Sequence, residues 1–275
     1  MDIQGVGEVA DVVRHEAELG DVRIHDVTAG SGPPIETGGT MANIVLVAGG
    51  WHGGWAYASI ARQLRARGNE VFTPTLTGLG ERAHLTSACP NLDTHIEDIA
   101  NVLRFEDLKN VILCGHSYAG MVISGVADRL SERISALVYI DAFVPEDGAS
   151  WWDLAGDHYR RVALERSGAD GLRVAPPVHL DPRCTPHPLA SFRQTIHLSG
   201  KWRSVKEKVF IYTTKWDRPS PLTSIYEALL KDPDWTVKAL PCGHNVMVQA
   251  PEQLLAVIAD LKAIRRVGIP GFVCD

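Results

Sequence analysis

The chain has 275 residues, of which 45% are hydrophobic and 22% are charged, and its formal net charge is −6. This composition is ordinary for a folded domain and excludes a collagen-like or low-complexity chain. No run of five or six Lys or Arg residues forms a basic patch for phosphate backbones, so we expect no nucleic-acid partner. No 18 apolar residues run together and the N-terminus lacks a signal-peptide core, so we expect a cytoplasmic protein without a membrane partner.

Six short apolar runs alternate with helical patterns from residue 43 onward. Apolar residues recur three and four positions apart over 122–130 and 254–261, which is typical of helices packed on a core. Continuously apolar strands that alternate with helices indicate an α/β fold, with a mostly parallel central sheet flanked by helices on both faces. The predicted strands are 43–48, 70–74, 110–114, 135–140, 208–213 and 235–240.

The alternation breaks between about residues 145 and 205, where the sequence is rich in proline and aromatic residues. We interpret this stretch as an insertion after the fourth strand, which would lie over the carboxyl edge of the sheet where open α/β sheets bind ligands. It is called the cap segment below. Residues 41–275 are predicted to form one domain that includes the cap segment. Residues 1–40 are predicted to be an extension, either an edge strand with a turn or a loose segment.

The stretch CGHSYAG, residues 114–120, places a serine among small residues where a predicted strand ends. A nucleophile elbow has this form, because a sharp strand-to-helix turn exposes the serine oxygen and leaves no room for bulky neighbours. A Gly-x-Ser-x-small pattern alone is easily matched at random, so its context matters. Here Gly115 follows an apolar run and an amphipathic helix resumes after Ser117. We predict that Ser117 is a catalytic nucleophile.

A serine hydroxyl is a weak nucleophile at neutral pH and needs a histidine base that a carboxylate orients. His244 lies in a glycine-containing loop after the last predicted strand, and we predict that it is the base. The acid is expected between the serine and the histidine in the chain. Asp217, just after the fifth strand, is the favoured acid. Asp141, at the end of the fourth strand, stays open as the alternative or as a residue that caps nearby amides.

The negative oxygen that forms during acyl transfer needs two backbone donors. One is expected from the residue after the nucleophile, Tyr118, and the other from the loop after the first core strand. That loop carries glycine pairs at 49–50 and 53–54, which allow the backbone to approach a ligand closely. We predict that the amides of Gly50 and Tyr118 form the oxyanion hole.

Six segments carry a family resemblance, namely IVLVAGGWHGGWAY, TPTLTGLGERAHL, VILCGHSYAGMVISGVADR, LVYIDAFVPEDGAS, TPHPLASFRQ and CGHNVMVQAPEQL. They resemble the branch of the α/β-hydrolase superfamily that contains hydroxynitrile lyases, plant methylesterases of the salicylate-binding type and bacterial pyrethroid-hydrolase-like esterases. The resemblance runs in order over roughly residues 43–262. It implies an α/β-hydrolase fold with an inserted cap.

Two positions bear on which chemistry of this branch is present. The plant lyases are similar but carry a threonine where this chain has Gly49 and a lysine where it has Asn245. In the lyases that lysine stabilises the cyanide leaving group, so the resemblance favours hydrolysis here. The chain also departs from the esterase pattern, with Ala48 in place of a histidine and Ala119 in place of a glycine. Alanine is small enough to preserve the elbow, and the departures bear on loop geometry and substrate range.

The sequence therefore predicts a carboxylesterase-type serine hydrolase that cleaves esters of small, largely apolar molecules through an acyl-enzyme. A hydroxynitrile-lyase-like or carbon–carbon bond cleaving enzyme is the alternative, and a binding protein on the same fold is another. The acyl-transfer mechanism requires no metal or organic cofactor, so none is expected. The five cysteines are widely spaced and form no CxxC pair, which indicates neither a disulfide framework nor a zinc knuckle. A homodimer is left open.

Several residues are candidates for contact with substrate. His52 and His116 flank the predicted site, although each is also expected as a hydrogen-bonded packing residue. Cap aromatics are expected to pack onto the core, with some of them lining an apolar pocket. The candidates for substrate contact are Gly49, His52, His116, Phe143, Trp151, Trp152, Phe192 and Val246.

Overall fold

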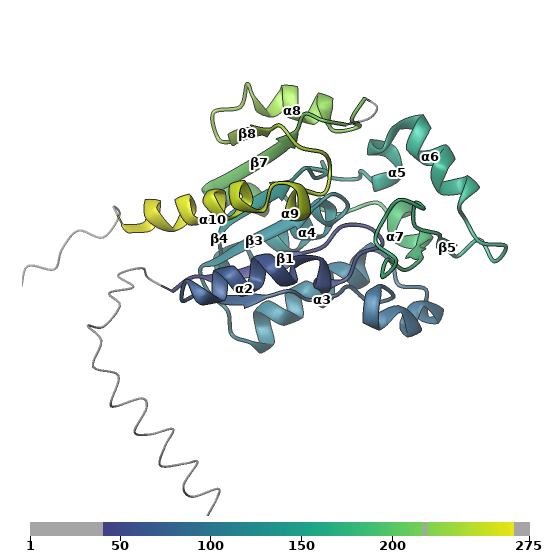
Figure 1. Cartoon of the computed structure of the whole chain (residues 1–275), viewed down its shortest axis with the longest axis horizontal. Coiled ribbons are helices and arrows are strands. Elements are labelled where there is room, and N and C mark those ends of the chain that lie inside the picture. Colours follow the sequence, from purple (N-terminus) through teal and green to yellow (C-terminus); the bar gives the residue numbers. More distant parts are fainter. Residues whose placement is uncertain (1–40, 217–218, 267–275) are drawn as a thin grey trace, which may run out of the picture. The chain divides into compact units, whose positions relative to one another are not determined.

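Six parallel strands form the central sheet of this computed structural model, which describes residues 41–216 and 219–266 (Figure 1). Their order across the sheet is β2-β1-β3-β4-β7-β8. Every strand predicted from the sequence is present, which confirms the α/β fold with its mostly parallel sheet. The strands are β1 (Asn43–Val47), β2 (Glu70–Phe72), β3 (Val111–His116), β4 (Ile134–Ile140), β7 (Glu207–Thr213) and β8 (Thr236–Leu240).

Two hydrophobic cores cover the opposite faces of this sheet. Successive residues of a strand point to opposite faces, and in β1 Val45 belongs to one core whereas Ile44 and Leu46 belong to the other. Helices α3 and α4 pack on the first face, and α2 and α10 pack on the second. The helices outside the cap segment are α2 (Ala58–Ala66), α3 (Leu92–Phe105), α4 (Ala119–Leu130), α8 (Thr223–Leu229), α9 (Val246–Gln249) and α10 (Pro251–Arg266), with short 3₁₀ turns η1 (Gly54–Tyr57), η2 (Gly80–Ala88) and η3 (Ser131–Arg133).

Strand register brings the ends of β1, β3 and β4 side by side. Val47 pairs with Gly115 near the end of β3, and His116 pairs with Ile140 at the end of β4. Because the strands are parallel, the loops that follow them leave the sheet at the same edge. The predicted oxyanion loop, the predicted elbow and Asp141 are therefore neighbours in space.

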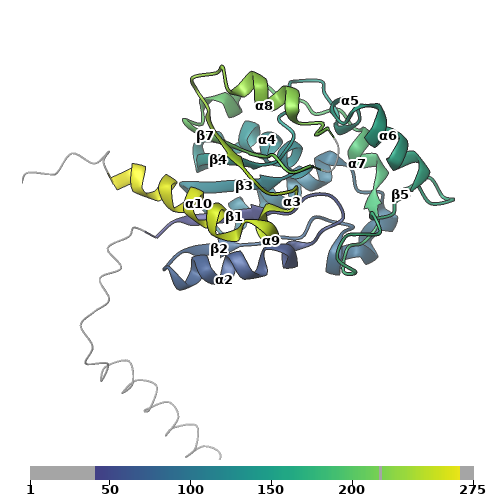
Figure 2. The same ribbon diagram turned by 45° about the horizontal axis from the view of Figure 1, so that its top comes forward.

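The cap segment lies between β4 and β7 in the chain. Both views show α5, α6, α7 and β5 grouped beyond one end of the sheet (Figure 1, Figure 2). Its two short strands pair in antiparallel fashion, with Val174 opposite His187. The elements of the segment are α5 (Trp151–Leu154), α6 (Gly156–Glu165), β5 (Arg173–Val174), β6 (His187–Pro188), α7 (Leu189–Arg193) and η4 (Lys201–Ser204).

Some sequence predictions concern parts of the chain that the structure does not describe. The extension predicted at residues 1–40 lies outside the described residues. Within residues 41–216 and 219–266, no helix combines the length and the apolar character needed to cross a membrane. The cysteines of this part, Cys89, Cys114, Cys184 and Cys242, are free thiols.

The contact between α3 and α4 depends on a glycine, which yields a stability prediction. A Cβ atom added at Gly125 would lie 2.3 Å from Cδ1 of Ile96. We expect Gly125→Ala to lower the free energy of unfolding by about 1–3 kcal/mol, because overpacking outweighs the gain in helix propensity. Ile96→Val removes Cδ1, the nearest clashing atom, and leaves the milder contact with Cγ1 at 2.8 Å. The double variant should therefore lose at least about 1 kcal/mol less unfolding free energy than the sum of the two single losses. Urea unfolding measures each value. Additive effects would contradict this packing argument.

Candidate active site

The turn between β3 and α4 has the strained geometry of a nucleophile elbow. Ser117 has a φ angle of 54°, a left-handed conformation that a non-glycine residue rarely adopts. Close packing holds it there, because a Cβ atom at Gly115 would lie 2.8 Å from the Ala119 carbonyl oxygen. At Gly120 the same atom would lie 2.0 Å from the carbonyl oxygen of Phe143. The small residues seen in the sequence thus leave space for neighbouring backbone.

His244 lies between the serine and a carboxylate. Its Nε2 atom is 2.9 Å from Ser117 Oγ, and its Nδ1 atom is 2.7 Å from Asp141 Oδ2. A carboxylate accepts hydrogen bonds, so Nδ1 carries the proton and Nε2 is left to accept the serine hydroxyl. This is the arrangement in which a histidine can remove a proton from a serine.

The carboxylate that contacts His244 in the structure is Asp141, and Asp217 as the acid stays a prediction from sequence. Asp217 lies outside the described residues. Asp141, which the sequence left open as the alternative, is fully buried and directly follows β4. Its carboxylate also accepts hydrogen bonds from the backbone amide and hydroxyl of Thr213, at 3.0 and 2.7 Å, and from Trp216 Nε1 at 3.1 Å. These donors offset the cost of burying a carboxylate and fix its orientation.

His116 lines the cavity and also supports His244 by a hydrogen bond. Its Nε2 atom donates to the carbonyl oxygen of His244 at 2.9 Å, and the two rings lie 4.5 Å apart. Burial, together with the neighbouring His244 and His52, holds the pKa of His116 well below its usual value. A Cβ atom at Gly49 would lie only 2.8 Å from the His116 ring. Gly49 therefore lets the loop after β1 pack directly on the elbow.

Two backbone amides are available beside Ser117. No hydrogen bond between described residues engages the amide of Gly50 or that of Tyr118. The Tyr118 ring points away into the core, where its hydroxyl donates to His95 Nδ1 at 2.9 Å. Unused donors next to a nucleophile are what a developing negative oxygen requires.

A cavity of about 930 Å³ opens onto the serine and the histidine. Of the residues proposed from sequence, it is lined by Gly50, His52, His116, Ser117, Tyr118, Phe143, Trp151, Phe192 and His244. Three of the predicted substrate contacts are not among its lining residues. Gly49 packs against the elbow, Val246 is fully buried, and Trp152 is half-buried, with the Arg193 guanidinium 5.0 Å from its ring.

The residues that form one wall of this cavity were not predicted from the sequence. Tyr159, Val162, Ala163 and Arg166 line it from one face of α6 and its C-terminal end, and Trp216 lines it from the loop after β7. The four positions at 159, 162, 163 and 166 are three and four residues apart, the spacing of one helix face. That signal was present within the cap segment, although the prolines and irregular pattern around it concealed it.

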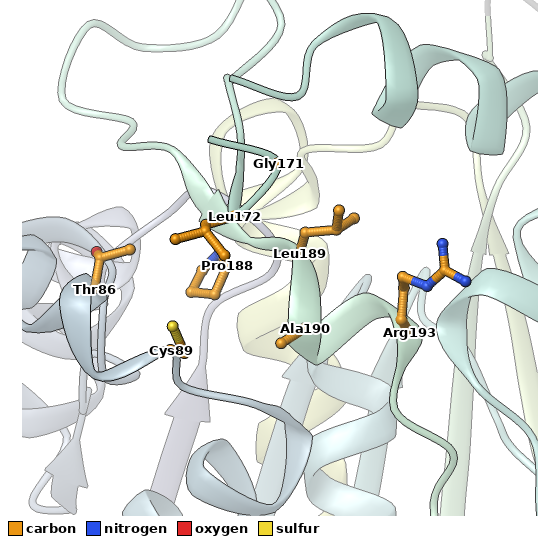
Figure 3. A pocket seen from close by; sticks show the side chains of 8 residues that line it. All are labelled: Thr86, Cys89, Gly171, Leu172, Pro188, Leu189, Ala190 and Arg193. Carbon is orange, nitrogen blue, oxygen red and sulfur yellow. The ribbon is translucent and has the colours of Figure 1, made fainter. Parts of the chain in front are cut away.

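A second, smaller cavity lies away from the site. It measures about 190 Å³ and is lined by Thr86, Cys89, Gly171, Leu172, Pro188, Leu189, Ala190 and Arg193 (Figure 3). It shares no lining residue with the large cavity and contains no histidine or carboxylate. The chemistry described above therefore belongs to the large cavity. Among the described residues, no group of three His, Cys, Asp or Glu side chains could hold a metal ion.

Known proteins resemble this chain over most of its length. The model of the alpha/beta hydrolase family matches residues 44–257. The chain is 42% identical over 246 residues to the carbendazim hydrolyzing esterase of Nocardioides sp. (strain SG-4G). This match covers 80% of this chain and 100% of that protein. It is 29% identical over 111 residues to the pyrethroid hydrolase of Sphingobium wenxiniae, covering 40% of this chain and 39% of that protein. These similarities confirm the resemblance read from the motifs.

A solved structure shows the same fold at lower identity. A crystal structure of a pyrethroid hydrolase matches with a TM-score of 0.69 at 20% identity, covering 82% of this chain and 98% of that one. At this identity the likeness concerns the fold alone, and it agrees with the parallel sheet described above.

Buried histidines around the site lead to a prediction on acid stability. Burial lowers the pKa of His95 from 6.5 to about 4, and it also lowers the pKa of His52, His116 and His187. Between pH 6.5 and 4 the unfolded chain binds protons that folded His95 does not, so stability should fall as the pH is lowered through this window. His95 alone would contribute up to about 1.4 kcal/mol per pH unit.

The His95→Gln variant should have a shallower loss of unfolding free energy over the same pH range, measured by urea unfolding at each pH. Gln at exposed His84 serves as the matched control for the loss of an imidazole. An unchanged slope in His95→Gln would show that His95 is not the buried neutral group described here.

Proposed function

Because the chain belongs to the alpha/beta hydrolase family, we propose that it is a carboxylesterase-type serine hydrolase that cleaves esters of small, largely apolar molecules. The observation that carries this proposal is the continuous hydrogen-bonded series from Ser117 through His244 to Asp141. The naming of relatives as esterases and hydrolases supports the same reaction type. A cytoplasmic location and a homodimer stay predictions from sequence.

In the proposed mechanism Ser117 Oγ attacks the ester carbonyl carbon while His244 Nε2 accepts the serine proton. Asp141 holds the protonated Nδ1 atom in place and stabilises the imidazolium that forms. The Gly50 and Tyr118 amides bind the negative oxygen of the tetrahedral intermediate. His244 then returns the proton to the leaving alcohol, and an acyl group remains on Ser117. Water attacks this acyl-enzyme by the same route and releases the acid.

The walls of the cavity support the proposed substrate class. Phe143, Trp151 and Phe192 present apolar surface near Ser117, and Tyr159 and Val162 extend it along α6. Aromatic and apolar walls suit small organic molecules, and the polar residues that also line the cavity, among them Arg166 and Lys215, can fix the orientation of such a molecule. The relative that is 42% identical is named for hydrolysis of carbendazim, so carbendazim is a suitable first substrate to test.

The alternative lyase chemistry would use the same triad as acid and base only. Asn245 lines the cavity beside His244, at the position where the resembling plant lyases have a lysine. An amide carries no positive charge to stabilise a cyanide leaving group, so this position favours hydrolysis. Release of cyanide or aldehyde from a cyanohydrin would instead favour the lyase.

Substitution of the triad should separate catalysis from binding. We expect Ser117→Ala to lower kcat for p-nitrophenyl esters by about 10³- to 10⁶-fold and to abolish labelling by a fluorophosphonate. Asp141→Asn should lower kcat by about 10²- to 10⁴-fold, because the histidine loses the partner that fixes its tautomer. Mass spectrometry of the labelled wild type should find the label on Ser117.

Asp217→Asn decides between the two acids. It retains Asp141 and should lose far less activity than Asp141→Asn, and the reverse order would return the acid to Asp217. A wild type that is neither labelled nor active on any ester would overturn the hydrolase proposal, leaving the lyase and the binding protein to be tested.

The apolar wall can be tested separately from the chemistry. Val162→Asn places an amide in the wall that α6 contributes to the cavity. We expect KM for a p-nitrophenyl ester of an aromatic acid to rise about 3- to 10-fold, because apolar contact is lost. KM for the small acetate ester should stay nearly constant and is the matched control. Equal changes for both esters would mean that this wall does not select the acyl group.

A further inference from the structure

The peptide between Gly50 and Trp51 is held at both ends by imidazoles. His52 Nδ1 donates to the Gly50 carbonyl oxygen at 2.8 Å. On the opposite edge of the same peptide, the Trp51 amide donates to His187 Nδ1 at 3.3 Å. His52 comes from the loop itself, whereas His187 comes from the cap segment, 136 residues along the chain. This peptide directly follows the amide proposed as an oxyanion donor.

The hydrogen bonds around His187 fix which of its nitrogens accepts. Ser191 Oγ donates its only proton to the Pro188 carbonyl oxygen at 2.8 Å. The Trp51 amide can only donate, so His187 Nδ1 accepts and the imidazole proton lies on Nε2, 2.8 Å from Ser191 Oγ. Nδ1 is left without a proton and can accept the Trp51 amide. Burial holds the pKa of His187 well below its usual value, so the ring stays neutral.

Trp51 occupies a backbone conformation that needs external support. Its φ angle is 66°, in the left-handed region that disfavours a bulky residue. Two further bonds from the cap segment hold it, since Trp51 Nε1 donates to the Val174 carbonyl at 2.9 Å and the Thr185 amide donates to the Trp51 carbonyl at 3.0 Å. The cap segment therefore contacts this one residue through three hydrogen bonds.

Close packing holds Gly50 in a fixed position relative to His187. The His187 ring stacks on Phe192 with centroids 4.1 Å apart and an interplanar angle of 8°. A Cβ atom at Gly50 would lie 3.6 Å from Phe192 and 3.7 Å from His187 Nδ1, which is ordinary contact distance. His187 is itself fully buried, so its ring has little freedom to move. The loop, the imidazole and the cavity wall thus form one packed unit.

We propose that His187 is a positioning residue for the oxyanion hole, which accepts the Trp51 amide and thereby aims the Gly50 amide at the reacting carbonyl. This inference rests on the proposed hydrolase function. Without the acceptor the partly buried Trp51 amide loses its hydrogen bond, and its peptide rotates toward another partner. Gly50 directly precedes this peptide, so rotation of the peptide also turns the Gly50 amide. The Gly50 N–H group then no longer points at the position where the oxyanion forms.

Two substitutions at His187 separate hydrogen bonding from packing. His187→Phe keeps a planar ring on Phe192 but removes the acceptor. His187→Asn loses the ring but places an oxygen near the position of Nδ1. The matched control is His197→Phe, the same change at an exposed position of the cap segment. Each variant is tested for kcat and KM on a p-nitrophenyl ester, for the rate constant of fluorophosphonate labelling, and for melting temperature.

We expect the loss to affect kcat and the rate constant of labelling, and not KM. His187→Phe should lower kcat and the labelling rate constant about 10- to 100-fold, with KM within about 3-fold of the wild type, because one oxyanion donor is misaimed. His187→Asn should recover most of that loss, and His197→Phe should match the wild type. Wild-type kcat in folded His187→Phe would overturn the proposal. So would an equal loss in both His187 variants with a raised KM, which would indicate a packing role only.

A third variant covers the case in which His187→Phe does not fold. Ser191→Ala leaves the ring in place but removes the acceptor that fixes the proton on Nε2. We expect it to lower kcat about 2- to 10-fold without changing KM, and an unchanged kcat would count against the proposal. Failure of the hydrolase function itself is distinguishable, because wild type would then resist the fluorophosphonate and no variant would differ from Ser117→Ala.

Discussion

Three neighbouring strands of the sheet lead into a non-glycine residue in the left-handed conformation, and the site depends on this constraint. Trp51 follows β1, Ser117 follows β3 and Asp141 follows β4, with φ angles of 66°, 54° and 43°. Such conformations cost about 1–3 kcal/mol each and persist only where the surroundings over-determine them. Each one turns the chain sharply at the carboxyl edge. The side chains and amides of three separate segments thereby meet at one point.

Buried hydrogen bonds hold these turns in place. Thr213 binds both oxygens of Asp141, and His116 binds the carbonyl oxygen of His244. In a site of low dielectric a buried polar group that loses its partner is costly, so each bond also penalises any alternative geometry. The strained backbone and the satisfied polar groups therefore support one another. The same contacts that stabilise the fold at this edge also set the distances between the reacting groups.

The sequence predicted the strands of the sheet well, and the contacts between the side chains of the site less well. Apolar runs and the elbow pattern located all six strands and Ser117, because both signals are local. The choice between Asp141 and Asp217 was not local, since both lie between Ser117 and His244 in the chain. It depends on which carboxylate lies against His244 in the fold, and spacing along the chain does not show this. Asp141 is in hydrogen-bond contact with His244, whereas Asp217 lies outside the described residues. The helix face of α6 that lines the cavity has the proper spacing, but only tertiary packing shows that it faces the site.

Under the proposed function, the cap segment takes part in the chemistry as well as in the choice of substrate. Val174, Thr185 and His187 reach the loop after β1 through Trp51, and Phe192 both stacks on His187 and lines the cavity. This bond from Trp51 requires a neutral imidazole, because a protonated His187 would present an N–H group to another N–H group. Burial supplies that neutrality by holding the pKa of His187 far below its usual value. The desolvation that weakens the fold in acid is therefore the same physical effect that keeps the oxyanion loop in place at neutral pH.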